Sequence, residues 1–215
     1  MNKPLVLITG ATGFLGSHLC CLLLKQGYRV HAIRRNPNSE GLFPRVHEFY
    51  QLPSSFQPTW ITGDILNVDD IISSLNGVSV VFHCAALVSF ANKDKQRLME
   101  HNVVGTRNIV NACLHSGVKQ IVYASSVAAL GRATGDDGPI SEDSIWVDSK
   151  YNSRYAISKY LAEQEVWRGQ EEGLQVTMVN PGIILGFGDG STGSNSIYQM
   201  IKKGQPFYPV GSNGF

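Results

Sequence analysis

Tyr155 and Lys159 are the pair of residues in this chain best suited to proton transfer. They stand four positions apart near the start of a predicted helix over 152–172, which places both side chains on one face. A tyrosine with an ordinary pKa of about 10 is a poor acid or base at neutral pH, but a nearby ammonium favours the phenolate and lowers that pKa. The lysine would supply this ammonium. Taken alone, the same spacing is also typical of a surface pair on an amphipathic helix.

Ser125 and Ser126 give this pair a chemical context. They follow an apolar run over 120–124 that predicts a strand, and ligands of open α/β sheets bind beyond the carboxyl ends of the strands. A hydroxyl there can hydrogen-bond a carbonyl or alcohol oxygen of a substrate. The two serines therefore indicate where a reacting oxygen would lie relative to the tyrosine.

The segment Thr9–Gly16, TGATGFLG, is a candidate phosphate cradle. It follows the apolar run 5–8 and opens a helical pattern. Glycines allow the tight turn and the close approach of a pyrophosphate, and the amino end of the following helix favours negative charge. Their spacing of three and three is not that of the common GxGxxG fingerprint. A plain turn between a strand and a helix is the alternative interpretation.

Short apolar runs alternate with helical patterns along the chain. The strands and helices that they predict must position the candidate catalytic residues and the glycine segment. Most runs do not alternate with polar residues, which is typical of strands buried on both faces of a parallel sheet. The predicted strands are Leu5–Thr9, Arg29–Ile33, Thr59–Thr62, Val78–His83, Gln120–Ala124 and Gln175–Asn180, and the predicted helices are Gly13–Gln26, Val68–Leu75, Lys93–Ser116 and Asn152–Glu172. This order predicts an α/β fold, a doubly wound (Rossmann) parallel sheet with helices on both faces.

Two segments depart from this rhythm. Residues 36–58 contain four prolines and are predicted to be irregular, with a short helix around 47–52. After Asn180 the sequence becomes rich in glycine and ends without a closing element. We therefore expect 1–180 to form the nucleotide-binding domain with the chemical residues. We expect 181–215 to begin a substrate-binding region that is incomplete in this chain.

Taken in order, the motifs resemble those of the extended short-chain dehydrogenase/reductases of the NAD-dependent epimerase/dehydratase superfamily. The GxxGxxG spacing is this family's own, and the matches run through nearly the whole chain. They are TGxxGxxG at 9–16, GD at 63–64, HCAA at 83–86, NVVGT at 102–106, SS at 125–126, YxxxK at 155–159 and NPGxxxG at 180–186. The chain most resembles the branch of dihydroflavonol 4-reductases and aldehyde or ketone reductases.

The resemblance implies roles for the residues of both candidate sites. Tyr155 would be the catalytic acid/base, and Lys159 would lower its pKa and bond the nicotinamide ribose. Ser126 would orient the substrate oxygen, and it is preferred to Ser125 because it lies five positions before Gly131, the distance seen in related members. The implied cofactor-binding residues are Gly10, Thr12, Gly13, Phe14, Leu15, Arg34, Asp64, Ile65, Ala85, Ala86, Tyr155, Lys159, Pro181 and Gly182.

Arg34 and Arg35 end the second predicted strand and favour NADP(H) over NAD(H). An acidic residue at this place would bond the ribose hydroxyls of NAD, whereas a guanidinium suits a 2′-phosphate. The alternative is that these side chains face solvent, in which case the cofactor selectivity would be slack.

The residues after Ser126 favour carbonyl reduction. Dehydratases of this family carry Asp-Glu at the positions where this chain has Val127 and Ala128. The predicted reaction transfers hydride from the nicotinamide to the carbonyl carbon of an aldehyde or ketone, while Tyr155 protonates the oxygen. A nucleotide-sugar epimerase and a hydroxysteroid-type dehydrogenase are the alternatives. Asn180 stands where the family often has arginine, which disfavours an anionic or nucleotide-sugar substrate.

A protein that binds NADP(H) without turnover, as some regulatory relatives do, is the alternative from another class. Such relatives usually lose the Tyr–Lys pair, which this chain keeps. The family also implies a homodimer through the helices 93–116 and 152–172. Asn102 is expected to anchor the active-site helix by side-chain hydrogen bonds, with a direct part in the reaction as the alternative. His83 is expected to lie near the cofactor groove.

Composition excludes several classes of partner. The chain has 215 residues, a net charge of +1 and a charged fraction of 16%, with scattered Lys and Arg, so neither nucleic acid nor a membrane surface is an expected partner. No apolar run reaches the length of about 18 residues that a membrane span requires, and a cytoplasmic protein is expected. The four cysteines form no CxxC pair and are expected to be reduced, and the histidines have no metal-ligand spacing, so no metal is expected.

Overall fold

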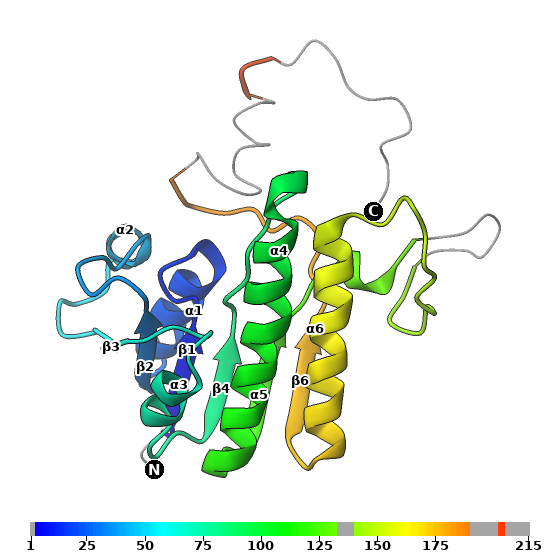
Figure 1. Ribbon diagram of the computed structural model, residues 1–215. Coiled ribbons are helices and arrows are strands. Elements are labelled where there is room, and N and C mark those ends of the chain that lie inside the picture. The colour runs from blue at the N-terminus through cyan, green and yellow to red at the C-terminus, as the bar shows by residue number, and fades with distance from the viewer. Residues whose placement is uncertain (1–2, 133–139, 190–201, 205–215) are drawn as a thin grey trace.

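Six parallel strands form the centre of the structure, a computed structural model that describes residues 3–132, 140–189 and 202–204 (Figure 1). The strands are β1 (Leu5–Thr9), β2 (Arg29–Arg34), β3 (Thr59–Thr62), β4 (Val80–His83), β5 (Gln120–Ala124) and β6 (Gln175–Val179). Their order across the sheet is β3-β2-β1-β4-β5-β6, the doubly wound order that the sequence predicts. The order reverses between β1 and β4, which is where such folds bind their ligands.

Helices cover both faces of this sheet, because its strands are apolar on both sides. Leu5 and Leu7 of β1 belong to one hydrophobic cluster, and Val6 and Ile8 belong to the other. The first cluster is covered by α3 (Val68–Ser74), α5 (Gly105–Ser116) and α6 (Arg154–Glu171), and the second by α1 (Phe14–Lys25) and α2 (Phe43–Phe49). The unalternating run at the start of the chain is therefore that of a strand buried on two sides.

The predicted helix over 93–116 is divided into several parts. A 3₁₀ turn, Asn92–Asp94, leads into the short helix α4 (Lys95–Leu98), and a π-helical turn, Met99–Val104, joins α4 to α5. The prediction of one regular helix is wrong at this turn. A π turn accommodates an extra residue and is frequent near functional sites, and this one carries Asn102.

Three further expectations meet the structure here. The short helix in the proline-rich segment lies at 43–49, earlier than predicted, with Pro44 in its first turn, where proline is favoured. The four cysteines are free thiols, and three of them are buried, as expected. Of the predicted segment 181–215, residues 190–201 and 205–215 lie outside the described residues. Within the described ranges, no helix has the length and apolarity needed to cross a membrane.

Candidate active site and cofactor groove

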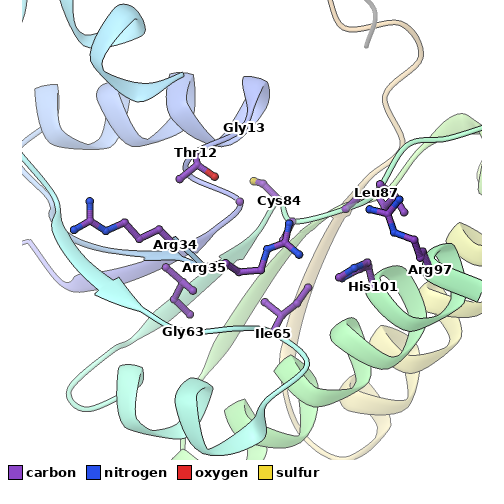
Figure 2. A pocket seen from close by; sticks show the side chains of 14 residues that line it. Thr12, Gly13, Arg34, Arg35, Gly63, Ile65, Cys84, Leu87, Arg97 and His101 are labelled. Carbon is purple, nitrogen blue, oxygen red and sulfur yellow. The ribbon is translucent and has the colours of Figure 1, made fainter. Parts of the chain in front are cut away.

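A pocket of about 220 Å³ lies at the carboxyl ends of the strands next to the reversal of strand order (Figure 2). It is built from the turn after β1, the end of β2 and the segments after β3 and β4, with one wall from α4 and the π turn. The lining residues are Gly10, Thr12, Gly13, Ile33, Arg34, Arg35, Gly63, Ile65, Cys84, Ala85, Ala86, Leu87, Arg97 and His101. Seven of the cofactor-binding residues implied by the sequence therefore line one pocket.

The glycine loop lines one side of this pocket. Gly10 has a φ of +74°, and a Cβ at this position would lie 2.7 Å from the backbone nitrogen of Ala85. The loop can therefore pass this close to the segment after β4 only without a side chain. Gly13 is the N-cap of α1 and has no side chain with which to cap the first N–H groups of that helix. These N–H groups suit an anion such as a pyrophosphate.

Phe14 and Leu15, which follow the loop, do not line this pocket. Phe14 lines a neighbouring cavity of about 290 Å³ together with Thr12, Gly13, Gly41, Leu42, Arg45 and Asp189. Leu15 is half-buried in α1 and lines neither cavity.

The two arginines after β2 extend in different directions (Figure 2). Arg35 is exposed and reaches into the pocket, toward the wall formed by Arg97 and His101. Arg34 extends the other way, and its Nη1 lies 3.5 Å from Oε1 of Glu40. The Nε of Arg34 is buried and has no hydrogen-bond partner among the described residues. The Arg35 guanidinium in the pocket, next to the positive charge of Arg34, fits an anionic group of a ligand, such as a 2′-phosphate.

Asp64 and Ile65, both among the cofactor-binding residues that the resemblance implies, lie differently relative to the pocket. Ile65 lines the pocket, whereas Asp64 does not. The Asp64 carboxylate accepts a hydrogen bond from the backbone N–H of Leu66 at 3.0 Å, and Asp70 accepts one from the Asp64 N–H at 3.0 Å. Here Asp64 shapes the turn after β3, and this turn brings Ile65 to the pocket.

Tyr155 and Ser126 meet beyond the carboxyl end of β5. Tyr155 is in the first turn of α6, which Ser153 caps by accepting a hydrogen bond from the Ala156 N–H at 3.0 Å. Burial raises the pKa of the Tyr155 phenol, and its hydrogen bond with Ser126 opposes that shift. The phenol ring lies edge-on to Phe90, with 5.9 Å between the ring centroids. The structure thus brings together the predicted proton donor and the predicted hydroxyl partner.

Lys159 is directed toward β5 from the same face of α6. Its Nζ donates hydrogen bonds to the Tyr123 hydroxyl at 2.6 Å and to the Ala124 carbonyl at 2.9 Å. The side chain is 1% exposed, and burial lowers the pKa of its ammonium to about 7. The pKa of Tyr155 is therefore raised in this structure, not lowered as expected. The reason is that burial dominates and the ammonium contacts a different tyrosine.

Asn102 joins the loop after β4 to the active-site helix. Its amide exchanges two hydrogen bonds with the backbone of Leu87, at 2.7 and 2.9 Å, and donates a third to the Ser158 hydroxyl at 2.9 Å. From its place in the π turn, the Asn102 side chain faces both the loop after β4 and the helix α6. The predicted anchoring role is confirmed.

His83 is buried below the groove. Its ring nitrogens are hydrogen-bonded to Thr9 at 2.7 Å and to Thr106 at 2.9 Å, which ties β1, β4 and α5 together. Burial and the charge of Lys159 lower the pKa of His83 to about 3, so the ring is neutral. Among the residues that the structure describes, no group of three or more His, Cys, Asp or Glu could hold a metal ion.

Three residues at this site were not predicted from the sequence to take part. Tyr123 accepts the bond from Lys159, and Asn180 donates hydrogen bonds to Glu163 at 2.6 Å and to the Ser126 carbonyl at 3.1 Å. Glu163 continues the spacing of four that begins with the Tyr–Lys pair, and that signal could have identified it. Pro181 accepts a hydrogen bond from Val127 at 3.0 Å, so the segment after β6 lies beside the serine turn.

A phosphate cradle at the reversal point of a doubly wound sheet defines a dinucleotide-binding α/β protein. The family model described as "NAD dependent epimerase/dehydratase family" matches residues 6–212, and the chain belongs to this family. Its fold is the NAD(P)-binding fold of the extended short-chain dehydrogenase/reductases, as the motifs indicated.

Individual relatives agree with this assignment. The chain is 34% identical to the "Putative dihydroflavonol 4-reductase" of Synechocystis, over 94% of this chain and 56% of that protein. It is 29% identical to cinnamoyl-CoA reductase 1 of Petunia hybrida, over 94% of this chain and 61% of that protein. The UDP-glucuronic acid 4-epimerase of Bacillus cereus, solved with NAD, superposes with a TM-score of 0.74 at 25% identity, over 93% of this chain and 63% of that one. The chain thus spans somewhat more than half the length of these relatives.

Proposed function

We propose that this protein is an NADP(H)-dependent oxidoreductase that reduces an aldehyde or ketone, with Tyr155 as the proton donor. The observation that carries the proposal is that the phosphate cradle after β1 and the hydrogen-bonded Ser126–Tyr155 pair after β5 both lie at the carboxyl edge of one parallel sheet. When bound, the cofactor supplies a hydride to the carbonyl carbon. The raised pKa of Tyr155 suits this direction, because the phenol keeps its proton at neutral pH until the oxygen takes it.

Lys159 has a separate role in this proposal. An ammonium carries three N–H donors, and two of them are used by Tyr123 and Ala124. The third is available for a ribose hydroxyl of the cofactor. The ammonium is buried and is held by two hydrogen bonds. It would therefore hold the cofactor beside Tyr155 in a nearly fixed position.

The choice of NADP(H) rests on the arginines after β2. The buried Nε of Arg34 lacks a partner within the described part of the chain, and the exposed Arg35 reaches into the pocket. A 2′-phosphate beside the end of β2 would pair with the Arg35 guanidinium, whereas the ribose hydroxyls of NAD would offer it no anion.

The surroundings of Tyr155 support a substrate with an apolar body. Phe90 is 76% exposed and contacts the Tyr155 ring, and Val88 is 55% exposed nearby in the chain. On the other side, Asn180 uses its amide to bind Glu163 and Ser126. An apolar carbonyl compound fits these neighbours better than a charged nucleotide sugar.

We further propose a cytoplasmic homodimer in which α5 and α6 of two copies pack together. Trp167 on α6 supports this pairing, since the side chain is 45% exposed on the outer face of the helix. Light scattering after gel filtration would measure the mass directly.

The test of the proposed reaction follows the absorbance of NADPH and NADH with aryl aldehydes, diketones, steroid ketones and UDP-sugars. We expect oxidation of NADPH with apolar carbonyl compounds and none with UDP-sugars. Conversion of a UDP-sugar to its epimer without net oxidation of cofactor would establish the epimerase alternative. A preference for NADH of about tenfold or more, equal to about 1.4 kcal/mol, would contradict the role of the arginines.

A further inference from the structure

Glu163 is a buried carboxylate on α6, one helical turn after Lys159. With Tyr155 and Lys159 it forms a series spaced by four along α6, so the three side chains share one face. It is 6% exposed. A carboxylate buried to this degree needs hydrogen bonds and a nearby opposite charge to offset its lost hydration. The mechanism proposed above leaves this group unused.

Asn180 supplies the hydrogen bond. Its amide nitrogen donates to Oε1 of Glu163 at 2.6 Å and also to the backbone carbonyl of Ser126 at 3.1 Å. The end of β6 therefore connects the buried carboxylate to the residue that contacts the Tyr155 phenol. A displacement of Glu163 would be transmitted to the backbone of Ser126 through a single amide group.

Lys159 supplies the opposite charge. Within the described residues, no lysine or arginine nitrogen lies within the 4.0 Å of a direct ion pair with Glu163. Lys159 is one helical turn away and buried in the same region. The negative charge of Glu163 raises the pKa of the Lys159 ammonium, which burial lowers to about 7. The two charges therefore interact through the protein interior, where screening by water is weak.

The other titratable groups around Lys159 are neutral near pH 7. Burial keeps the imidazole unprotonated, with a pKa of about 3, and raises the pKa values of the thiol, to about 12, and of both phenols. These groups are His83 on β4, Cys84 just after β4, Tyr123 on β5 and Tyr155 on α6. From the π turn and α5, the nearby Asn102 and Thr106 carry no charge. Among these neighbours in the described structure, Glu163 alone brings a negative charge.

We propose that Glu163 is a positioning residue of this active site. Its negative charge keeps the ammonium of Lys159 protonated near neutral pH, and its hydrogen bond to Asn180 fixes the backbone at Ser126. This inference rests on the proposed function, because Lys159 and Ser126 matter to the reaction only if a cofactor and a carbonyl oxygen bind beside them. The face of α6 then carries, in order, a proton donor, an ammonium and its counter-charge.

The direct test is an NMR titration of Lys159 in protein labelled with ¹³C at the lysine ε-carbon, with the signal assigned by its loss in Lys159→Met. We expect Glu163→Gln, which keeps an oxygen for Asn180 but removes the charge, to lower the titration midpoint of Lys159 by about one pH unit. Glu165→Gln is the matched control, because Glu165 lies on the same helix and pairs with Arg168 at 2.9 Å. Its midpoint should equal that of the wild type. An unchanged midpoint in Glu163→Gln would overturn the proposal.

This titration needs neither substrate nor turnover. Failure of the protein to reduce any carbonyl compound would thus refute the proposed function, but the effect of Glu163→Gln on the Lys159 midpoint could still be measured and interpreted. An Asn180→Ala variant separates the two parts of the role. We expect it to keep the Lys159 midpoint and to lower kcat at every pH. An unchanged kcat in this variant would overturn the role of the amide at Ser126.

A thermal measurement covers the case in which Glu163→Gln does not fold alone. In a Lys159→Met background the carboxylate has lost its counter-charge, so adding Glu163→Gln should raise the Tm at neutral pH. A purely structural hydrogen bond predicts the reverse, a further fall in Tm. That fall would overturn the counter-charge role.

Discussion

The two sides of the groove hold their positive charges in opposite ways. On the cofactor side, Arg35 is exposed and extends into the pocket, and the neighbouring Arg34 is half-buried, with Glu40 at 3.5 Å and the Trp60 ring beside its guanidinium. On the catalytic side, Lys159 is 1% exposed and makes hydrogen bonds of 2.6 and 2.9 Å. The first arrangement lets cations adjust to an anion, and the second fixes one ammonium in place.

This difference suggests that the exposed arginine governs the affinity for the cofactor, whereas the buried lysine governs the geometry of the reacting groups. Exposed cations contribute attraction that water and salt screen, so changing them alters binding with little effect on folding. A buried ammonium with fixed partners costs free energy to bury and in return keeps its donors aligned. Substitutions on the cofactor side should therefore change cofactor choice, whereas substitutions on the catalytic side should change turnover or stability.

The largest effect should come from the catalytic side. We expect Tyr155→Phe to lower turnover by about 10²- to 10⁴-fold, because the phenol that donates the proton is lost. The Kd for NADPH, measured by fluorescence quenching, should stay within about twofold, since the ring remains. Tyr151→Phe is the control, as Tyr151 is exposed and four residues earlier. Equal losses in both variants would break the distinction between the two sides.

Gly10→Ala should cause the next largest effect, on the cofactor side but through sterics. The new Cβ would lie 2.7 Å from the backbone of Ala85 at a φ of +74°. We expect a loss of about 2–4 kcal/mol in the free energy of unfolding, measured in urea. Gly27→Ala has a similar φ of +82° but no atom within 4 Å of the new Cβ, so its cost should be only about 1 kcal/mol. Similar costs for both would show that the close approach of the two segments is unimportant.

Arg35→Ala should change cofactor choice without destabilising the fold. We expect the affinity for NADPH to fall by about tenfold while that for NADH is unchanged, because a charged hydrogen bond to a 2′-phosphate is lost. Arg34→Ala measures the share of the buried Nε in the same assay. An equal loss for NADH and NADPH would show that the arginines bind a part common to both cofactors.

The smallest effect should be a pH dependence of stability due to His83. Its pKa is about 3 in the folded protein and 6.5 in the unfolded chain, so only the unfolded chain gains a proton just below pH 6.5. Stability is thus complete above the unfolded pKa and is lost as the pH falls toward the folded one. Between pH 7 and pH 6 we expect a loss of about 0.7 kcal/mol. In His83→Gln this part of the pH dependence of the unfolding free energy, measured with urea at each pH, should vanish. An unaltered pH dependence would mean that another group causes it.

The same contrast explains what the sequence could predict. The strands, their order and the glycine loop follow from short local patterns, and all six strands lie where the sequence places them to within two residues. The Tyr–Lys pair and Ser126 were also identifiable, because each follows or belongs to a recognisable element. The partners Tyr123 and Asn180 were not, since their bonds join residues 36 and 17 positions or more apart in the chain.

Two local differences have physical reasons of their own. The π turn at 99–104 could not be predicted from an apolar pattern that suits any helix, and within this turn Asn102 bonds Leu87 and Ser158 at once. The raised pKa of Tyr155 was missed because spacing on a helix gives the distance to Lys159 but not the direction of its side chain. That direction is set by Tyr123 and Ala124 on β5.

The most direct test of the central claim is isotopic. The protein is mixed with NADPH that carries deuterium at the transferable C4 position and with an aryl ketone that the absorbance assay shows to be reduced, and the alcohol is analysed by mass spectrometry. The account predicts one deuterium at the carbinol carbon for each NADPH oxidised, and only trace product in Tyr155→Phe that still binds NADPH. Product without deuterium, or full transfer in Tyr155→Phe, would contradict it.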